Sequence, residues 1–211
     1  MVNVTYKYTA HAKYATDIVN GLYKVEFDNL APSADIVAVE ASSSTNVVKT
    51  FDNVLEIDAP FGAALSVVAS GSYSGKVTVD GFDYLGQHMT EEITASGTTA
   101  VAGVKCFKFI SKVTCASGAN VTVTLSRKLI LGLPYKTVAI ISEVRDGVKA
   151  TTTQLVAPVL TAGTATSSDP KGKINLATYA NAANVKLILV ADDFDSATLG
   201  GGLFGIPHYH A

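Results

Sequence analysis

The chain has 211 residues, of which 48% are hydrophobic and only 16% are charged, a composition that excludes a mainly disordered protein. The formal net charge of -2 includes no dense run of Lys or Arg, so the electrostatic footprint of a direct nucleic-acid binder is missing. The longest apolar stretch, residues 185–191, falls short of the roughly 20 residues that span a bilayer. Because few charges are available to solvate the surface, we expect a partner protein to cover part of it.

The N-terminal segment alternates polar and apolar residues, which is the pattern of a half-buried strand. Tyr6, Tyr8 and Tyr14 share one face with Ala10 and Ala12. We therefore predict an extended N-terminal arm whose tyrosines contact a neighbouring subunit by adding a strand to its sheet edge. This end has no apolar signal-peptide core, so we expect the protein to be made in, and to fold in, the cytoplasm.

Short segments rich in Val and Thr follow at near-regular spacing, separated by clusters of Pro, Gly, Ser and Asn. Convincing helical periodicity is missing, and residues 177–184 are the one plausible helical turn. We therefore predict an all-β chain, a β-sandwich or jelly-roll-like barrel of about a dozen short strands with extended N- and C-terminal arms. The further predicted strands are 22–27, 35–40, 54–59, 75–80, 89–94, 105–110, 120–126, 136–144, 149–156, 173–178 and 184–191.

Acidic and histidine side chains gather around two glycines between residues 76 and 94. They have neither the order of a calcium loop nor that of a zinc protease, so metal binding by this stretch is the less favoured interpretation. Asp and Gly are the residues that a tight reversal needs, which favours a hairpin loop at residues 80–87. The side chains are Asp80, Asp83, His88, Glu91 and Glu92.

Glu91 stands out in the strand that follows this loop. Thr90, Glu92 and Thr94 share the outward face, whereas Glu91 alternates with Met89 and Ile93. A carboxylate at a strand edge is the simple interpretation, and a salt bridge between subunits is the functional one. Glu91 is therefore a candidate interface residue.

Cys106 and Cys115 are the only cysteines, and on one extended strand they would lie about 30 Å apart. That separation is too large for a disulfide, so we predict two buried free thiols. A weak boundary at residues 129–136, marked by Gly132 and Pro134, divides the chain into a β-sandwich part, 1–128, and a second β part, 137–197. The second part can also complete the same domain.

Residues 198–211 form an apolar, glycine-rich tail. Leu203, Phe204, Ile206 and Tyr209 follow three consecutive glycines and have no strand pattern that would bury them. We expect this C-terminal arm to dock on another surface, and its four apolar side chains are candidate interface residues.

Catalytic signatures are missing from the sequence. No Gly-x-Ser-x-Gly elbow, P-loop or paired Cys/His nucleophile occurs. His208 and His210 resemble a metal half-site, but only Ala211 follows them, so interface packing or solvation is the favoured interpretation. We expect a protein that is not an enzyme and that has no catalytic residue, metal site or cofactor.

Residues 67–114 resemble a pattern that recurs in virion proteins of tailed bacteriophages. The pattern joins an apolar strand, a Ser/Gly turn, "VTV-x-G-x-D-x-x-G", a "MTE"-type strand, "G-x-x-x-V-x-G-x-K-x-F" and a closing "I-x-x-V". The chain lacks the long helix of a usual major capsid protein, so the resemblance does not extend to the shell protein itself. The matching residues are Gly81, Asp83, Gly86, Thr90, Glu91, Gly103, Lys105 and Phe107.

The resemblance implies a capsid decoration (cement) protein on the virion surface, with the major capsid protein and neighbouring copies of itself as partners, in a dimer or a trimer. A neck or tail component is the nearest alternative. A carbohydrate-binding or host-adhesion β module also stays open, although the chain has no Trp to stack on sugars.

Overall fold

The computed structural model describes residues 7–9, 22–27, 34–151, 154–158, 169–176 and 184–191. Every helix or strand assigned within them is a β-strand, which confirms the predicted all-β class. No helix in these ranges has the length and apolar character required to cross a membrane. The strands are β1 (Lys7–Thr9), β2 (Leu22–Phe27), β3 (Ala34–Ala41), β4 (Val47–Glu56), β5 (Ala63–Ala69), β6 (Lys76–Phe82), β7 (His88–Thr94), β8 (Val101–Phe107), β9 (Phe109–Cys115), β10 (Val121–Gly132), β11 (Thr137–Arg145), β12 (Val148–Lys149), β13 (Leu155–Val156), β14 (Lys173–Asn175) and β15 (Val185–Ala191).

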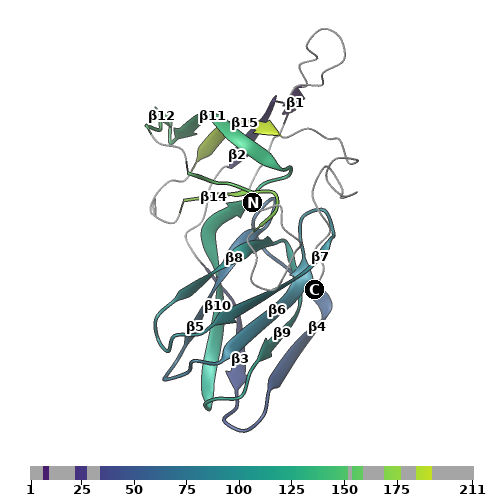
Figure 1. Ribbon diagram of the computed structural model, residues 1–211, viewed down its shortest axis with the longest axis vertical. Coiled ribbons are helices and arrows are strands. Elements are labelled where there is room, and N and C mark those ends of the chain that lie inside the picture. Colours follow the sequence, from purple (N-terminus) through teal and green to yellow (C-terminus); the bar gives the residue numbers. More distant parts are fainter. Residues whose placement is uncertain are drawn as a thin grey trace.

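The strands pair antiparallel in three sheets. Sheet B has the order β13-β14-β10-β5-β8, with β3 also paired to β10, and sheet C has the order β4-β9-β6-β7. In Figure 1 sheet C and the strands β3, β5 and β8 of sheet B form the lower half of the molecule, whereas β14 lies higher, towards β2. Sheet A, with the order β1-β2-β15-β11-β12, lies above them (Figure 1).

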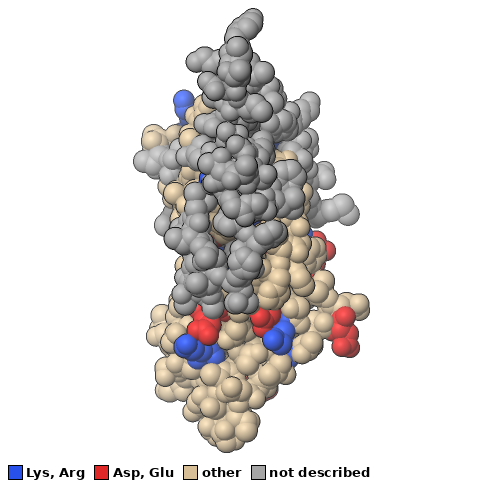
Figure 2. Space-filling model, turned by 45° about the vertical axis from the view of Figure 1, so that its right-hand side comes forward, with Lys and Arg blue, Asp and Glu red and all other residues tan. Residues whose placement is uncertain are grey.

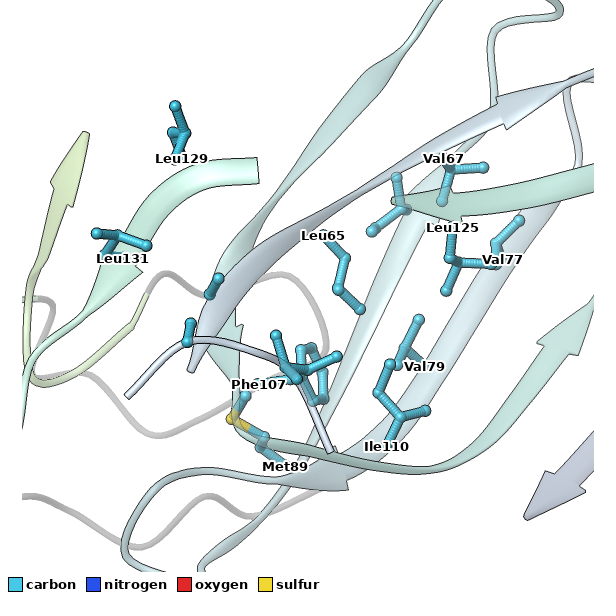
Figure 3. Close-up of a cluster of buried hydrophobic side chains, with 14 of the residues drawn as sticks. Leu65, Val67, Val77, Val79, Met89, Phe107, Ile110, Leu125, Leu129 and Leu131 are labelled. Atoms are coloured by element: carbon cyan, nitrogen blue, oxygen red, sulfur yellow. The ribbon is translucent and has the colours of Figure 1, made fainter. Parts of the chain in front are cut away.

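Sheets B and C bury their facing sides in one core. On β6, Val77 and Val79 point inward while Thr78 and Asp80 point outward, as strand alternation requires. Leu65 and Leu125 of sheet B meet them from the other side (Figure 3). The two sheets therefore form a sandwich whose inner faces are largely apolar, although charged side chains are buried near the β6–β7 loop and at Arg127 of β10.

Strand β10 links the two halves of the molecule. Its lower part pairs with β3 and β5, and its end, Ile130 to Gly132, pairs with β14. The predicted boundary at 129–136 begins within this strand, and the division into two parts stays a prediction. The pairing of β2 with β15 brings the N-terminal strands into sheet A with β11, rather than into the sandwich.

The observed strands differ from the predicted ones in at least four places. The predicted strand 54–59 overlaps only the end of β4, which spans Val47–Glu56. β5 was not among the predicted strands, because all but one of its residues are buried and it shows no alternation. The predicted strand 105–110 is interrupted at Lys108. The N–H of Lys108 donates to the Phe82 carbonyl, and its Nζ donates to the carbonyls of Ile57 and Ala59. In place of the predicted strand 149–156 the structure has two separate short strands, β12 and β13.

Two other predictions concern the cysteines and the helical turn. Cys106 and Cys115 are both buried and free, as predicted. The predicted helical turn at 177–184 lies outside the described residues, apart from Asn184.

Candidate functional site

The loop between β6 and β7 is the hairpin that the sequence predicts. Phe82 pairs with His88, and the N–H of Asp83 donates to the Gln87 carbonyl over 3.0 Å. Gly86 closes the turn with a φ of 78°, which a residue with a side chain rarely adopts. The carboxylate oxygen Oδ1 of Asp83 accepts hydrogen bonds from Leu85 N (2.8 Å) and Gln87 N (2.9 Å). The Asp83 side chain thus fixes the loop by accepting hydrogen bonds from the backbone of the loop.

The other oxygen of Asp83 makes a contact between distant parts of the sequence. Its Oδ2 lies 2.9 Å from Nζ of Lys171, and both side chains are completely buried. Lys171 belongs to the short segment that precedes β14. The pair therefore ties the β6–β7 loop to the segment that leads into sheet B.

The neighbouring residues of that segment are held by β8. Asp169 accepts hydrogen bonds from Cys106 N (3.1 Å, to Oδ2) and from Lys171 N (2.9 Å, to Oδ1). Lys173 donates from Nζ to the Val104 carbonyl. The carbonyl of Lys171 accepts from Thr137 N of β11 over 3.0 Å, so the segment also anchors the start of sheet A.

Glu91 on β7 completes the arrangement from the sandwich side. Its Oε1 accepts from the backbone N–H groups of Val104 and Lys105, and Lys105 Nζ donates to the Thr90 carbonyl over 2.6 Å. Its Oε2 is buried and accepts no hydrogen bond from the described part of the chain. A Cβ added to Gly103 would lie 2.6 Å from that oxygen, so only glycine leaves room for the carboxylate there.

These side chains form a buried charged cluster with three carboxylates and three ammonium groups. A charge inside a protein is costly unless an opposite charge and hydrogen bonds compensate it, and here the formal charges cancel. The cluster joins strands β7 and β8 and the β6–β7 loop to the segment before β14. Its members, all at most 6% exposed, are Asp83, Glu91, Lys105, Asp169, Lys171 and Lys173.

The environment shifts the pKa values of several members. Burial raises the pKa of Glu91 to about 7, against the opposing effect of the Val104 and Lys105 N–H groups. Burial also lowers the pKa of Lys105, while Glu91 and Asp169 oppose that shift. For Lys171 burial acts downward, but the carboxylates of Asp169 and Asp83 outweigh it and raise the pKa. As long as the two groups are not covalently joined, Lys171 therefore faces Asp83 as an ammonium group.

Three side chains of the same sequence stretch lie on the opposite face of the hairpin. Asp80 accepts a hydrogen bond from Thr90 Oγ1 (2.8 Å) and pairs with Lys112 (3.0 Å). Its Oδ1 also lies 3.9 Å from Nε2 of His88. Glu92 pairs with Lys76 over 2.8 Å. Figure 2 shows such acidic and basic groups side by side on the lower half of the surface. Within the described ranges, no three His, Cys, Asp or Glu residues are grouped so as to hold a metal ion.

The structure corrects one predicted interface residue. Glu91 was a candidate for a salt bridge between subunits, but it is 1% exposed and its hydrogen-bond donors belong to the same chain. The alternation pattern that placed Glu91 with Met89 and Ile93 was right, and the inward face of β7 is simply not apolar throughout.

The other candidate interface residues stay predictions. The backbone of Tyr8 lies on β1 opposite Tyr23 of β2. The remaining candidates, and the histidines of the tail, lie outside the described residues: Tyr6, Tyr14, Leu203, Phe204, Ile206, Tyr209, His208 and His210.

Four members of the cluster were not singled out as site residues by the sequence analysis. Asp169, Lys171 and Lys173 lie in or next to the polar, turn-rich stretch 160–173, which is typical of an exposed loop. One signal was available, since a carboxylate on an inward strand face, as at Glu91, needs buried polar or charged partners.

No protein-family model, curated protein or solved structure matches this chain.

Proposed function

We propose that the chain is a non-enzymatic structural protein of a tailed-phage virion, which binds the assembled capsid and stabilises it as a decoration protein. The proposal starts from the resemblance of residues 67–114 to phage virion proteins. A protein that binds only the assembled lattice stabilises that lattice by its binding free energy. Repetition over symmetric sites turns a modest affinity per copy into strong avidity.

One structural observation supports this role: the residues that carry the resemblance hold the scaffold together. Asp83 and Gly86 shape the β6–β7 loop, and Glu91 and Lys105 belong to the buried charged cluster. Gly103 gives Glu91 its space. A pattern of this kind specifies a rigid sandwich, which is what a protein that bridges subunits under load requires.

Three segments of the chain are proposed to contact a capsid. In sheet C, β4 is an edge strand that carries the exposed apolar side chains Val48 and Val54. The N-terminal arm and residues 198–211 are the other proposed contacts. Deletion of residues 198–211 is expected to weaken attachment to the lattice while leaving the β-sheet circular dichroism spectrum of the protein unchanged.

The deciding experiment is to purify virions of the phage whose genome encodes the chain and to locate the protein by electron cryo-microscopy. Copies at lattice-symmetric positions on the head are expected, and heads that lack the protein should open at lower temperature. Finding the protein at the neck or tail would replace the decoration role with the nearest alternative. Its absence from virions would overturn the proposal.

A carbohydrate-binding module is the second candidate, and one observation favours it. On the outer face of sheet C, Phe82 lies edge-to-face with His88 at 5.8 Å between ring centroids, next to Asp80 and Lys112. Aromatic rings beside polar groups are typical of sugar sites. A glycan array probed with the isolated protein tests this candidate, and a Phe82→Ala variant should lose any specific signal.

A further inference from the structure

The contact between Lys171 and Asp83 holds the nitrogen of one side chain against a carboxylate oxygen of the other. Nζ of Lys171 lies 2.9 Å from Oδ2 of Asp83. The other oxygen, Oδ1, sits in a cradle of two backbone N–H groups, from Leu85 at 2.8 Å and Gln87 at 2.9 Å. Both side chains are fully buried, so bulk water has no access to the pair.

We propose that Lys171 and Asp83 form an intramolecular amide bond in the folded protein. One proton of the Lys171 ammonium passes to Oδ2, and the freed amine attacks the carboxyl carbon of Asp83. A second proton then moves from the nitrogen to Oδ2, which leaves as water while the amide nitrogen keeps the third. One C–N bond forms, one C–O bond breaks, and no oxidant, reductant or other reactant is needed.

The cradle around Oδ1 is what makes the step accessible. When the amine attacks, negative charge develops on Oδ1, and the Leu85 and Gln87 N–H groups are already directed at that atom. Such preorganised donors stabilise a tetrahedral intermediate more effectively in a site without water than in solution. Held in contact, the two groups react as if at a concentration of about 10⁵ M or more.

Burial also favours the product. An ion pair inside a protein retains much of the cost of removing two charges from water, whereas an amide carries no charge. The bond joins residues 88 positions apart in the sequence, so it would close a long loop and fix the β6–β7 hairpin to the segment before β14. This inference does not depend on the proposed function.

Intact mass spectrometry of the full-length protein under denaturing conditions tests the bond. The wild-type mass is expected to be lower than the sequence mass by one water molecule. Trypsin should yield residues 77–105 covalently joined to residues 150–173, because an acylated Lys171 is not cleaved. A wild-type protein with its full mass and separate peptides ending at Lys105 and Lys171 would overturn the proposal.

Two variants give the control. Lys171→Arg keeps a positive charge but has no amine that can form this amide, so its mass should show no loss of water. Lys76→Arg alters a solvent-exposed ion pair. The distance from Lys76 Nζ to Glu92 Oε2 is 2.8 Å, similar to that between Lys171 Nζ and Asp83 Oδ2. That variant should still lose one water, because its Lys171 and Asp83 are intact. Loss of water in both variants would place the modification elsewhere and refute the assignment.

Discussion

The β6–β7 hairpin carries the same kinds of charged residue on its two faces, and the faces behave differently. Inside, Asp83 and Glu91 are buried against Lys171 and Lys105. Outside, Glu92 pairs with Lys76, whose side chain is 62% exposed. Water screens the outer pair, but the inner charges depend on their protein partners. Adjacent residues such as Glu91 and Glu92 therefore lie in different surroundings, and their replacement should change stability by different amounts.

Replacement of Asp83 is expected to have the largest effect. Asp83→Ala leaves Lys171 buried without its carboxylate and removes the acceptor for two backbone N–H groups, which should cost about 3–5 kcal/mol. Asp80→Ala, on the outer face, should cost no more than about 1 kcal/mol. Urea unfolding followed by circular dichroism measures both.

The double variant Asp83→Ala, Lys171→Met is the control for this prediction. It removes both charges, so it should recover part of the stability that Asp83→Ala loses. A double variant as unstable as the single one would mean that the loop geometry or the loss of the proposed Asp83–Lys171 amide, rather than the unpaired ammonium, accounts for the loss.

The fold was more predictable from the sequence than the cluster was. Strand β2 was predicted with its observed bounds, because the alternation in residues 22–27 is local. The turn role of Asp83 was also local, since Asp and Gly define such loops. Asp83 and Lys171 are 88 residues apart in the sequence. The alternation of polar and apolar residues is a local pattern, so it cannot predict which distant residue Asp83 contacts.

A pH-dependent effect of intermediate size is expected at Glu91. Its pKa rises from 4.5 to about 7 on folding, so between these values the folded protein binds a proton that the unfolded chain releases. Its contribution to stability is therefore present below pH 4.5 and is lost as the pH rises through 7, by about 3 kcal/mol.

Glu91→Gln removes this titration and isolates it from the other carboxylates. As the pH rises from 4.5 to above 7, the unfolding free energy of the wild type should fall relative to that of the variant. Thermal melts across this range measure the difference. A constant difference would show that Glu91 stays ionised throughout, held by Lys105 and Lys173.

A smaller effect is expected from filling the space next to Glu91. The Cβ of Gly103→Ala would lie 2.6 Å from the Glu91 carboxylate, and displacing that group should cost about 1–3 kcal/mol. Gly71→Ala is the matched control, since its Cβ would meet only a side-chain methyl of Val121 at 3.2 Å. Equal melting temperatures for the two variants would contradict a tight fit around Glu91.

The smallest effect should come from the exposed pair on the outer face. Lys76→Gln removes the contact with Glu92, which should cost less than about 1 kcal/mol, because solvent screens the pair and both side chains lose conformational freedom to form it. High salt should abolish even this difference, whereas the loss caused by Asp83→Ala should persist, since ions do not reach a fully buried pair. Unfolding of wild type and both variants at low and high salt separates the two faces. If salt reduces the Asp83→Ala loss as strongly as the Lys76→Gln loss, solvent reaches the inner cluster, and the contrast between the two faces is wrong.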